Sequence, residues 1–167
     1  MVPEKVDQLL KDHKMTVGRH KYLVSMIDEL KCQAEEWSKN IAEDIVTLGN
    51  QSIDGMPHGT TVGNPTERFG IMLASGFTPA GLKELEHEIR QLEKEAHEKA
   101  VSIKIVEAWL DGLTEKERWI VEKQLIDGMY WREVVSEYHR RYGEEYSKEG
   151  LKRIRDSAVS KIHKMAR

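Results

Sequence analysis

The residues from Ser147 to the end of the chain have the side chains needed to bind a polyanion. Seven lysines and arginines stand there against two acids, whereas the chain as a whole has a formal net charge of −3. Lysine and arginine bind phosphate oxygens, and arginine, lysine and glutamate also bond the edges of DNA bases. A basic segment on an otherwise acidic chain is typical of a polyanion contact at one end.

An α-helix over this stretch would have one apolar and one polar face. At 100° per residue, the face that we expect to be buried holds Leu151, Ile154, Ala158, Ile162 and Met165. On the outward face, we expect base contacts from Glu149, Lys152, Arg153 and Ser157. Long side chains on the flanks, which reach phosphates, are Lys148, Arg155 and Lys161. The candidate DNA-binding residues are Arg132, Ser147, Lys148, Glu149, Lys152, Arg153, Arg155, Ser157 and Lys161.

Two further helical patterns precede the basic helix and predict a helix–turn–helix unit over 113–165. The first pattern opens with a capping box from Thr114 to Glu117 and ends at Gly128. The second begins at about Tyr130 or Trp131, and its inward residues are Val134, Val135 and Tyr138. Ser147 is the predicted N-cap of the third helix.

The connection before Ser147 is roughly six residues longer than a helix–turn–helix unit needs. We therefore expect the second helix to continue through Arg141 or Tyr142 and to stop at Gly143. Arg140 and Arg141 are then either further phosphate ligands or solvated side chains. The extension would also change the angle of the third helix.

Helical patterns with one apolar stripe fill most of the preceding chain. We expect a short helix over 4–12, a polar break at DHKMT, and a helix from Thr16 to Leu48 that stops at Gly49. Residues 49–64 are rich in glycine and predict a loop or linker. Asn64, Pro65 and Glu67 predict the start of a short helix that ends at Gly76.

A long helix over about 79–110, capped by Thr78 and Pro79, follows with strict three–four spacing. Its narrow seam consists of Leu82, Leu85, Ile89, Leu92, Ala96, Lys99, Ile103, Val106 and Leu110. Such a seam packs either on the 16–48 helix of the same chain or on another copy, and both contacts coexist in a dimer of helical hairpins. The tryptophans at 37, 109, 119 and 131 are interpreted as core or interface anchors.

These patterns predict an all-α protein with a coiled-coil-like N-terminal region and a C-terminal helix–turn–helix domain. The predicted divisions are N-terminal helices over 1–48, a linker over 49–64, a short helix and a long oligomerisation helix over 65–110, and a DNA-binding domain over 111–167. A homodimer or higher homo-oligomer is expected, because paired half-sites need paired modules.

Other classes of function find little support in the sequence. The seven histidines form no His-x-x-x-His or HExxH motif, no glycine-rich loop is followed by GK[ST], and Cys32 is alone. We therefore expect no enzyme, cofactor or metal site. No apolar run approaches the length of a membrane span and the N-terminus lacks a signal-peptide pattern, so the expected location is the cytoplasm.

The C-terminal patterns also resemble a known family. The run LTEKERWIVEKQLIDGMYWREVVSEY from Leu113, followed by SKEGLKRIRDSAVSKI from Ser147, is similar to region 4 of sigma factors. Together with DGMPHG from Asp54 and GNPTE from Gly63, it more closely resembles phage transcriptional regulators of the ArpU/RinA type. The resemblance covers most of residues 50–167 and implies a phage or prophage activator of late genes. Such a protein acts with host RNA polymerase in the host cytoplasm.

Two alternatives remain open. A small terminase-like packaging subunit also joins a helix–turn–helix to oligomerising helices, but its DNA module usually comes first in the chain, and here it comes last. A helical adaptor would bind a protein such as polymerase without reading DNA.

Overall fold

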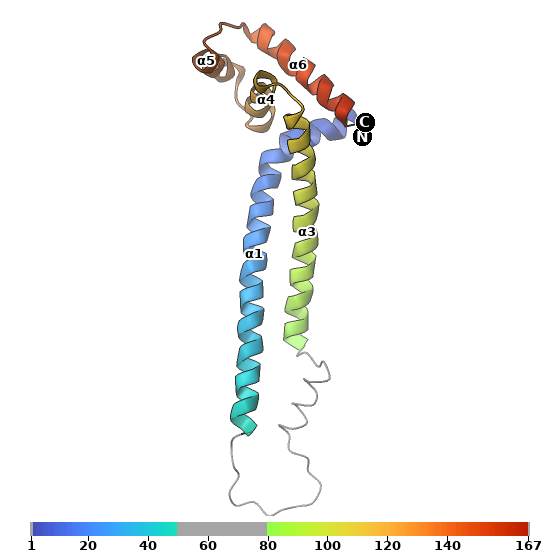
Figure 1. Cartoon of the computed structure of the whole chain (residues 1–167), viewed down its shortest axis with the longest axis vertical. Coiled ribbons are helices and arrows are strands. Elements are labelled where there is room, and N and C mark those ends of the chain that lie inside the picture. Colours follow the sequence, from blue (N-terminus) through green and yellow to red (C-terminus); the bar gives the residue numbers. More distant parts are fainter. Residues whose placement is uncertain (1, 50–79, 167) are drawn as a thin grey trace, which may run out of the picture. The chain divides into compact units, whose positions relative to one another are not determined.

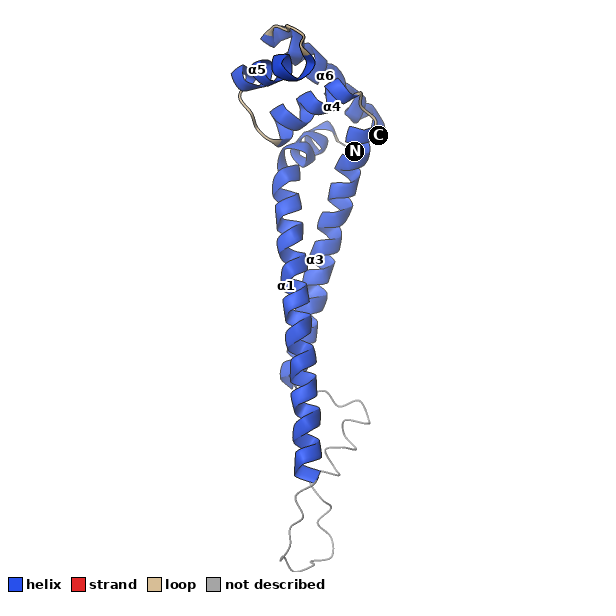
Figure 2. Cartoon of the chain, turned by 60° about the vertical axis from the view of Figure 1, so that its left-hand side comes forward, coloured by secondary structure: helices blue, strands red, loops and turns tan. Residues whose placement is uncertain are grey.

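The computed structural model describes residues 2–49 and 80–166, with side chains described for 2–41 and 80–166 (Figure 1). Within these ranges every regular element is helical, which confirms the predicted all-α class (Figure 2). A long pair of helices is joined to a small C-terminal helical bundle. The elements are α1 (Pro3–Gly49), α3 (Ala80–Asp111), α4 (Glu115–Val121), the π-helix η1 (Glu122–Ile126), α5 (Trp131–Tyr142) and α6 (Lys148–Met165).

Helix α1 runs without interruption from Pro3 to Gly49. The predicted polar break at DHKMT is therefore wrong, because residues 12–16 are helical. None of these five residues is glycine or proline, so nothing in the backbone chemistry stops the helix there. Gly49, the predicted stop, is the last described residue of α1, and the residues that would show the stop lie outside the described part of the chain. Of the predicted linker over 49–64, Gly49 is helical, and its other residues lie outside the described part of the chain, as do the short helix ending at Gly76 and the Thr78–Pro79 cap.

The chain divides into two compact units, and the first combines residues 1–22 with 96–167. Its first hydrophobic cluster joins side chains from both ends of the chain. The buried members are Val6, Leu10, Val106, Trp109, Leu110, Val121, Ala158 and Ile162. The first turns of α1 therefore belong to the same unit as the C-terminal bundle, a grouping that differs from the divisions expected at residues 48 and 110.

Polar contacts also join the N-terminal turns to the bundle. His163 Nε2 lies 2.9 Å from Asp7 Oδ1, and Lys14 Nζ lies 3.0 Å from Asp127 Oδ1. Partly exposed polar contacts of this kind contribute little each, and these two join α1 to α6 and to η1. Burial of Val6 and Leu10 supplies the larger stabilising term.

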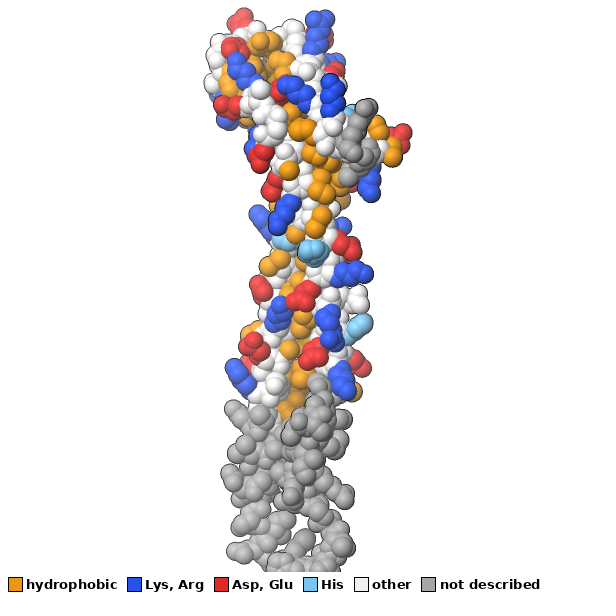
Figure 3. All heavy atoms as spheres, turned by 45° about the vertical axis from the view of Figure 1, so that its right-hand side comes forward, with side chains coloured by type: hydrophobic (Ala, Val, Ile, Leu, Met, Phe, Trp, Pro, Cys, Tyr) orange, Lys and Arg blue, Asp and Glu red, His pale blue; other side chains and the backbone are white. Residues whose placement is uncertain are grey.

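The second unit comprises residues 23–95 and holds the rest of the helix pair. Leu23, Ile27 and Ile89 are its buried apolar residues in the described part. Lys31 Nζ donates to a carboxylate oxygen of Glu93 at 2.7 Å and so links the two helices. Figure 3 shows hydrophobic side chains in a strip along the helix pair, with charged side chains on both sides. This is the surface expected of a coiled-coil-like pair.

In the described part of the chain, no helix is long and apolar enough to cross a membrane.

Candidate nucleic-acid interface

The first helix of the C-terminal bundle begins where the sequence predicted. The Thr114 Oγ1 accepts from the backbone N–H of Glu117 at 3.5 Å, and the Thr114 N–H donates to Glu117 Oε2 at 3.1 Å. This capping box starts α4, whose buried Trp119, Ile120 and Val121 face the core. The helix then widens into η1 and ends before Gly128, which has φ of 70°.

Helix α5 follows after four residues and is packed by Val134 and Tyr138, which are both buried, and by the partly buried Val135. It continues to Tyr142, and Gly143 caps it with φ of 67° and an N–H that donates to the carbonyl of His139 at 2.8 Å. The extension of the second helix and its glycine stop are therefore confirmed. Only glycine adopts this left-handed conformation without steric cost.

The long connection from Gly143 to Ser147 is held against the bundle by its own side chains. Lys116 Nζ donates to both carboxylate oxygens of Glu144, at 2.7 and 2.8 Å, and this hydrogen bond lowers the pKa of Glu144. The Tyr138 hydroxyl also donates to Glu144, at 3.4 Å, and the Tyr146 ring meets the Tyr138 ring edge-on at 5.5 Å. These contacts place Ser147 and so determine where α6 begins.

Helix α6 starts as predicted at Ser147, whose Oγ accepts from the Gly150 N–H at 3.1 Å. Leu151, Ala158 and Ile162 are fully buried, and Ile154 is partly buried against the second hydrophobic cluster. Met165 departs from the expected buried face, because its side chain is 44% exposed. Its Sδ lies over Gly112, where an added Cβ would come within 2.6 Å, at the edge of the core.

The opposite face of α6 is open to solvent, as the helical wheel indicated. Glu149, Arg153 and Ser157 are exposed and Lys152 is partly exposed. Lys148 at the start of α6 and Arg132 at the start of α5 are exposed too. Lys164 also lies on the outward face of α6 and is exposed. Lys164 is not among the candidate residues that the sequence predicted.

The basic side chains of residues 111–166 fall into two groups. Seven are ion-paired, and they are Lys116, Arg118, Lys123, Arg140, Arg141, Arg155 and Lys161. Five make no ion pair with any residue that the structure describes, and they are Arg132, Lys148, Lys152, Arg153 and Lys164. Four of these five are on α6 and the fifth opens α5. The basic side chains of the bundle without an ion pair to a described residue therefore all lie on α5 and α6.

Arg155 and Lys161, expected on the flanks as phosphate ligands, are both bonded to other side chains of the bundle. The Arg155 guanidinium donates to Gln124 Oε1 at 3.1 Å and to Asp156 Oδ1 at 2.7 Å, and it lies 5.3 Å from the Trp131 ring centroid. These contacts tie α6 to η1 and to the start of α5. A phosphate contact by Arg155 would have to replace them.

Lys161 joins α6 to the first turn of α4. Its Nζ donates to the two carboxylate oxygens of Glu117 at 2.6 and 2.9 Å. Burial raises the pKa of Glu117, but hydrogen bonds from Lys161 and Thr114 outweigh it and hold the pKa below its usual range. Glu117 is therefore ionised and paired near the core, and it is only 8% exposed.

Arg140 and Arg141 on the added turn of α5 have intrachain partners as well. Arg140 lies 3.3 Å from Glu137, and Arg141 lies 3.4 Å from Glu115 and over the Tyr142 ring. These pairs are exposed and weak, so they hold the side chains without burying their charge.

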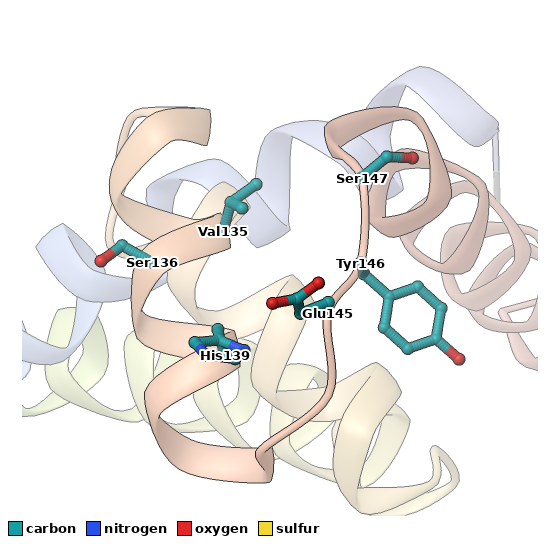
Figure 4. A pocket seen from close by; sticks show the side chains of 6 residues that line it. All are labelled: Val135, Ser136, His139, Glu145, Tyr146 and Ser147. Carbon is teal, nitrogen blue, oxygen red and sulfur yellow. The ribbon is translucent and has the colours of Figure 1, made fainter.

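A groove lies between α5 and the connection that leads to α6. It is lined by Val135, Ser136, His139, Glu145, Tyr146 and Ser147, as Figure 4 shows. The groove adjoins the first turn of α6 but holds a carboxylate beside its hydroxyls and imidazole. Within the described residues no cluster of histidine, cysteine, aspartate and glutamate side chains is suited to a metal ion.

No family of known proteins, no curated protein and no solved structure matches this chain.

Proposed function

We propose that this chain is a sequence-specific DNA-binding transcriptional regulator that places α6 in the major groove. The observation that carries the proposal is the division of charge in the bundle. Seven of its lysine and arginine side chains form ion pairs, and the five that form none with a described residue lie on α5 and α6. Lysine and arginine side chains without an ion pair, on the outward face of a helix–turn–helix, are available to bind phosphates and the edges of DNA bases.

Within this proposal the outward residues of α6 divide by position. Glu149, Lys152, Arg153 and Ser157 occupy its first three turns, which in a helix–turn–helix approach the base edges. Arginine and lysine donate to guanine, and glutamate accepts from the amino group of cytosine. Lys148, Lys164 and Arg132 lie where a long side chain reaches a phosphate, and they supply affinity with little sequence information.

The resemblance to ArpU/RinA-type regulators supports a finer proposal. In it the chain is a phage or prophage activator that acts with host RNA polymerase at late promoters. The resemblance of residues 113–162 to these regulators is what supports this finer role.

Selection of duplexes from a random library, followed by binding titrations with the enriched sequence, tests the proposal. We expect enrichment of a defined site, and we expect the Lys152→Ala/Arg153→Ala double variant to lose preference for that site over scrambled DNA. Lys123→Ala is the matched control, because Lys123 lies on η1 and not on α6. Its Nζ is ion-paired with Asp127 at 3.1 Å. No enrichment, or equal losses in both variants, would contradict the assigned reading face.

The salt dependence gives a second, quantitative test. If each of the three basic side chains assigned to phosphates, Lys148, Lys164 and Arg132, neutralises one phosphate, the slope of log affinity against log salt is about −2.7 per module. Affinity then falls by about 40-fold between 50 and 200 mM salt. A protein-binding adaptor that does not bind DNA would show no salt-sensitive affinity for any duplex.

A further inference from the structure

Among the described residues 23–41 and 80–95, the helix pair leaves one side of its apolar seam open. In heptad notation, where a and d residues face the neighbouring helix, Ile27 of α1 and Ile89 of α3 are a residues, and both are buried. Of the described d residues of this unit only Leu23 is buried, whereas Leu30, Leu85 and Leu92 are half-buried. Because d residues lean toward the g side of a helix, the open apolar surface lies along the d and g positions of the pair.

Trp37, another d residue, is the largest side chain on this surface. A Cβ added at Gly81 would come within 2.5 Å of Trp37 Cη2, so the glycine lets the indole lie across α3. The rest of the ring is open, and Trp37 is 45% exposed. The neighbouring a residues Ala34 and Leu82 are only half-buried. A large, rigid apolar side chain in such surroundings is the usual anchor of a protein interface.

The charges beside the open surface differ between the two helices. The g residues of α1 are the uncharged Met26, Gln33 and Asn40. On α3 the g residues are Gly81, Glu88 and Glu95, so this edge is acidic. The described side chains of the unit include nine acids and five bases, a net charge of −4. This charge disfavours DNA or an anionic membrane as the molecule that covers the surface.

We infer that a second copy of the chain covers this surface, with α1 of each copy lying on α3 of its partner. A heptad surface with apolar d residues on both helices complements itself across a two-fold axis. If α1 lay on the partner's α1 instead, the Glu88 and Glu95 edges of the two copies would face each other. When α1 packs on the partner's α3, the acidic edge of α3 lies opposite the uncharged edge of α1. The two α1 helices of the dimer then run parallel.

The state of association of the full-length chain tests the inference, independently of DNA binding. Sedimentation equilibrium should show a dimer that dissociates on dilution. Trp37→Lys should raise the dissociation constant by about tenfold or more, since it removes the anchor and buries a charge. Val24→Lys is the matched control: Val24 is 40% exposed on α1 but lies at an e position, on the other side of the seam. Circular dichroism checks that both variants keep their helices.

A monomer at all concentrations would overturn the inference, and equal effects of the two lysines would overturn the choice of face. A second pair of variants tests the helix arrangement at the exposed Gln33. Gln33→Lys should tighten the dimer and Gln33→Glu should weaken it, because the partner's Glu88 lies opposite. If α1 faced the partner's α1, both variants would set like charges together and weaken the dimer equally, and that result would overturn the arrangement.

Discussion

Two lysines one turn apart on α6 should have separate roles, and exchanging each for methionine distinguishes them. Lys161 is paired with Glu117, whereas Lys164 is exposed and makes no ion pair with a described residue. Methionine keeps the length of the lysine stem and removes its charge. We expect Lys161→Met to lower the stability of the fold and Lys164→Met to lower affinity for DNA.

The loss for Lys161→Met follows from what remains around Glu117. The carboxylate loses two contacts of 2.6 and 2.9 Å but keeps those from the Thr114 N–H and hydroxyl at 3.1 and 3.0 Å. A hydrogen bond to a charged group contributes about 1.5–3 kcal/mol. The Lys161 side chain is 48% exposed, so solvent screens part of this and we expect a loss of about 1–2 kcal/mol. For a chain of this size the midpoint of thermal unfolding should fall by about 2–8 °C.

Lys164→Met should change the free energy of unfolding by less than about 0.5 kcal/mol, because it removes no described contact. The slope of log affinity against log salt should become shallower by about 0.9, the effect of one phosphate contact. Thermal unfolding and fluorescence anisotropy with a labelled duplex measure the two quantities on the same samples. The reasoning is refuted if Lys161→Met leaves stability unchanged and weakens DNA binding as much as Lys164→Met.

Three further changes test the packing of the unit formed by residues 1–22 and 96–167. Leu10→Ala should lower the free energy of unfolding by about 2–5 kcal/mol in urea titrations, because Leu10 is fully buried. A loss under about 1 kcal/mol would contradict the packing of the N-terminal turns on this core. Gly143→Ala should cost about 1 kcal/mol, since alanine is strained at φ of 67°, while Gly18→Ala tests a glycine without that constraint and with open space around an added Cβ. Burial lowers the pKa of His13, although Glu107 and Glu122 act in the opposite direction. The unfolded chain then takes up the proton first, so stability should fall as pH drops through about 6.5, and His13→Leu should flatten that slope; an unchanged slope would contradict the assignment.

Local rules accounted for most element boundaries in the C-terminal bundle. Thr114 and Ser147 are N-caps because their hydroxyls accept backbone N–H groups, and Gly143 ends α5 because it adopts positive φ. These effects depend on residues within one helical turn, so the sequence contains the information they need. The same rules predicted a break near His13 wrongly, since a run of polar residues does not by itself end a helix.

Contacts between distant residues could not be predicted in this way. A helical wheel gives the direction in which Lys161 leaves α6, but not that Glu117, 44 positions earlier, lies within 2.6 Å. For the same reason Arg155 was expected to reach a phosphate, although it is held by Gln124 and Trp131. The joining of Val6 and Leu10 to Ala158 and Ile162 likewise depends on tertiary packing.

Contacts between distant residues decide which basic residues belong to the proposed interface. Periodicity alone counts every outward lysine and arginine of α6 as a possible DNA ligand, and the phosphate count then sets the expected salt dependence. When Arg155 and Lys161 are removed from the candidate residues and Lys164 is added, five basic side chains without an ion pair remain, Arg132 among them. If the ion-paired lysines and arginines also bound phosphates, the slope of log affinity against log salt would be steeper by about 0.9 for each of them. The measured slope therefore tests the ion pairs of the bundle as well as its proposed function.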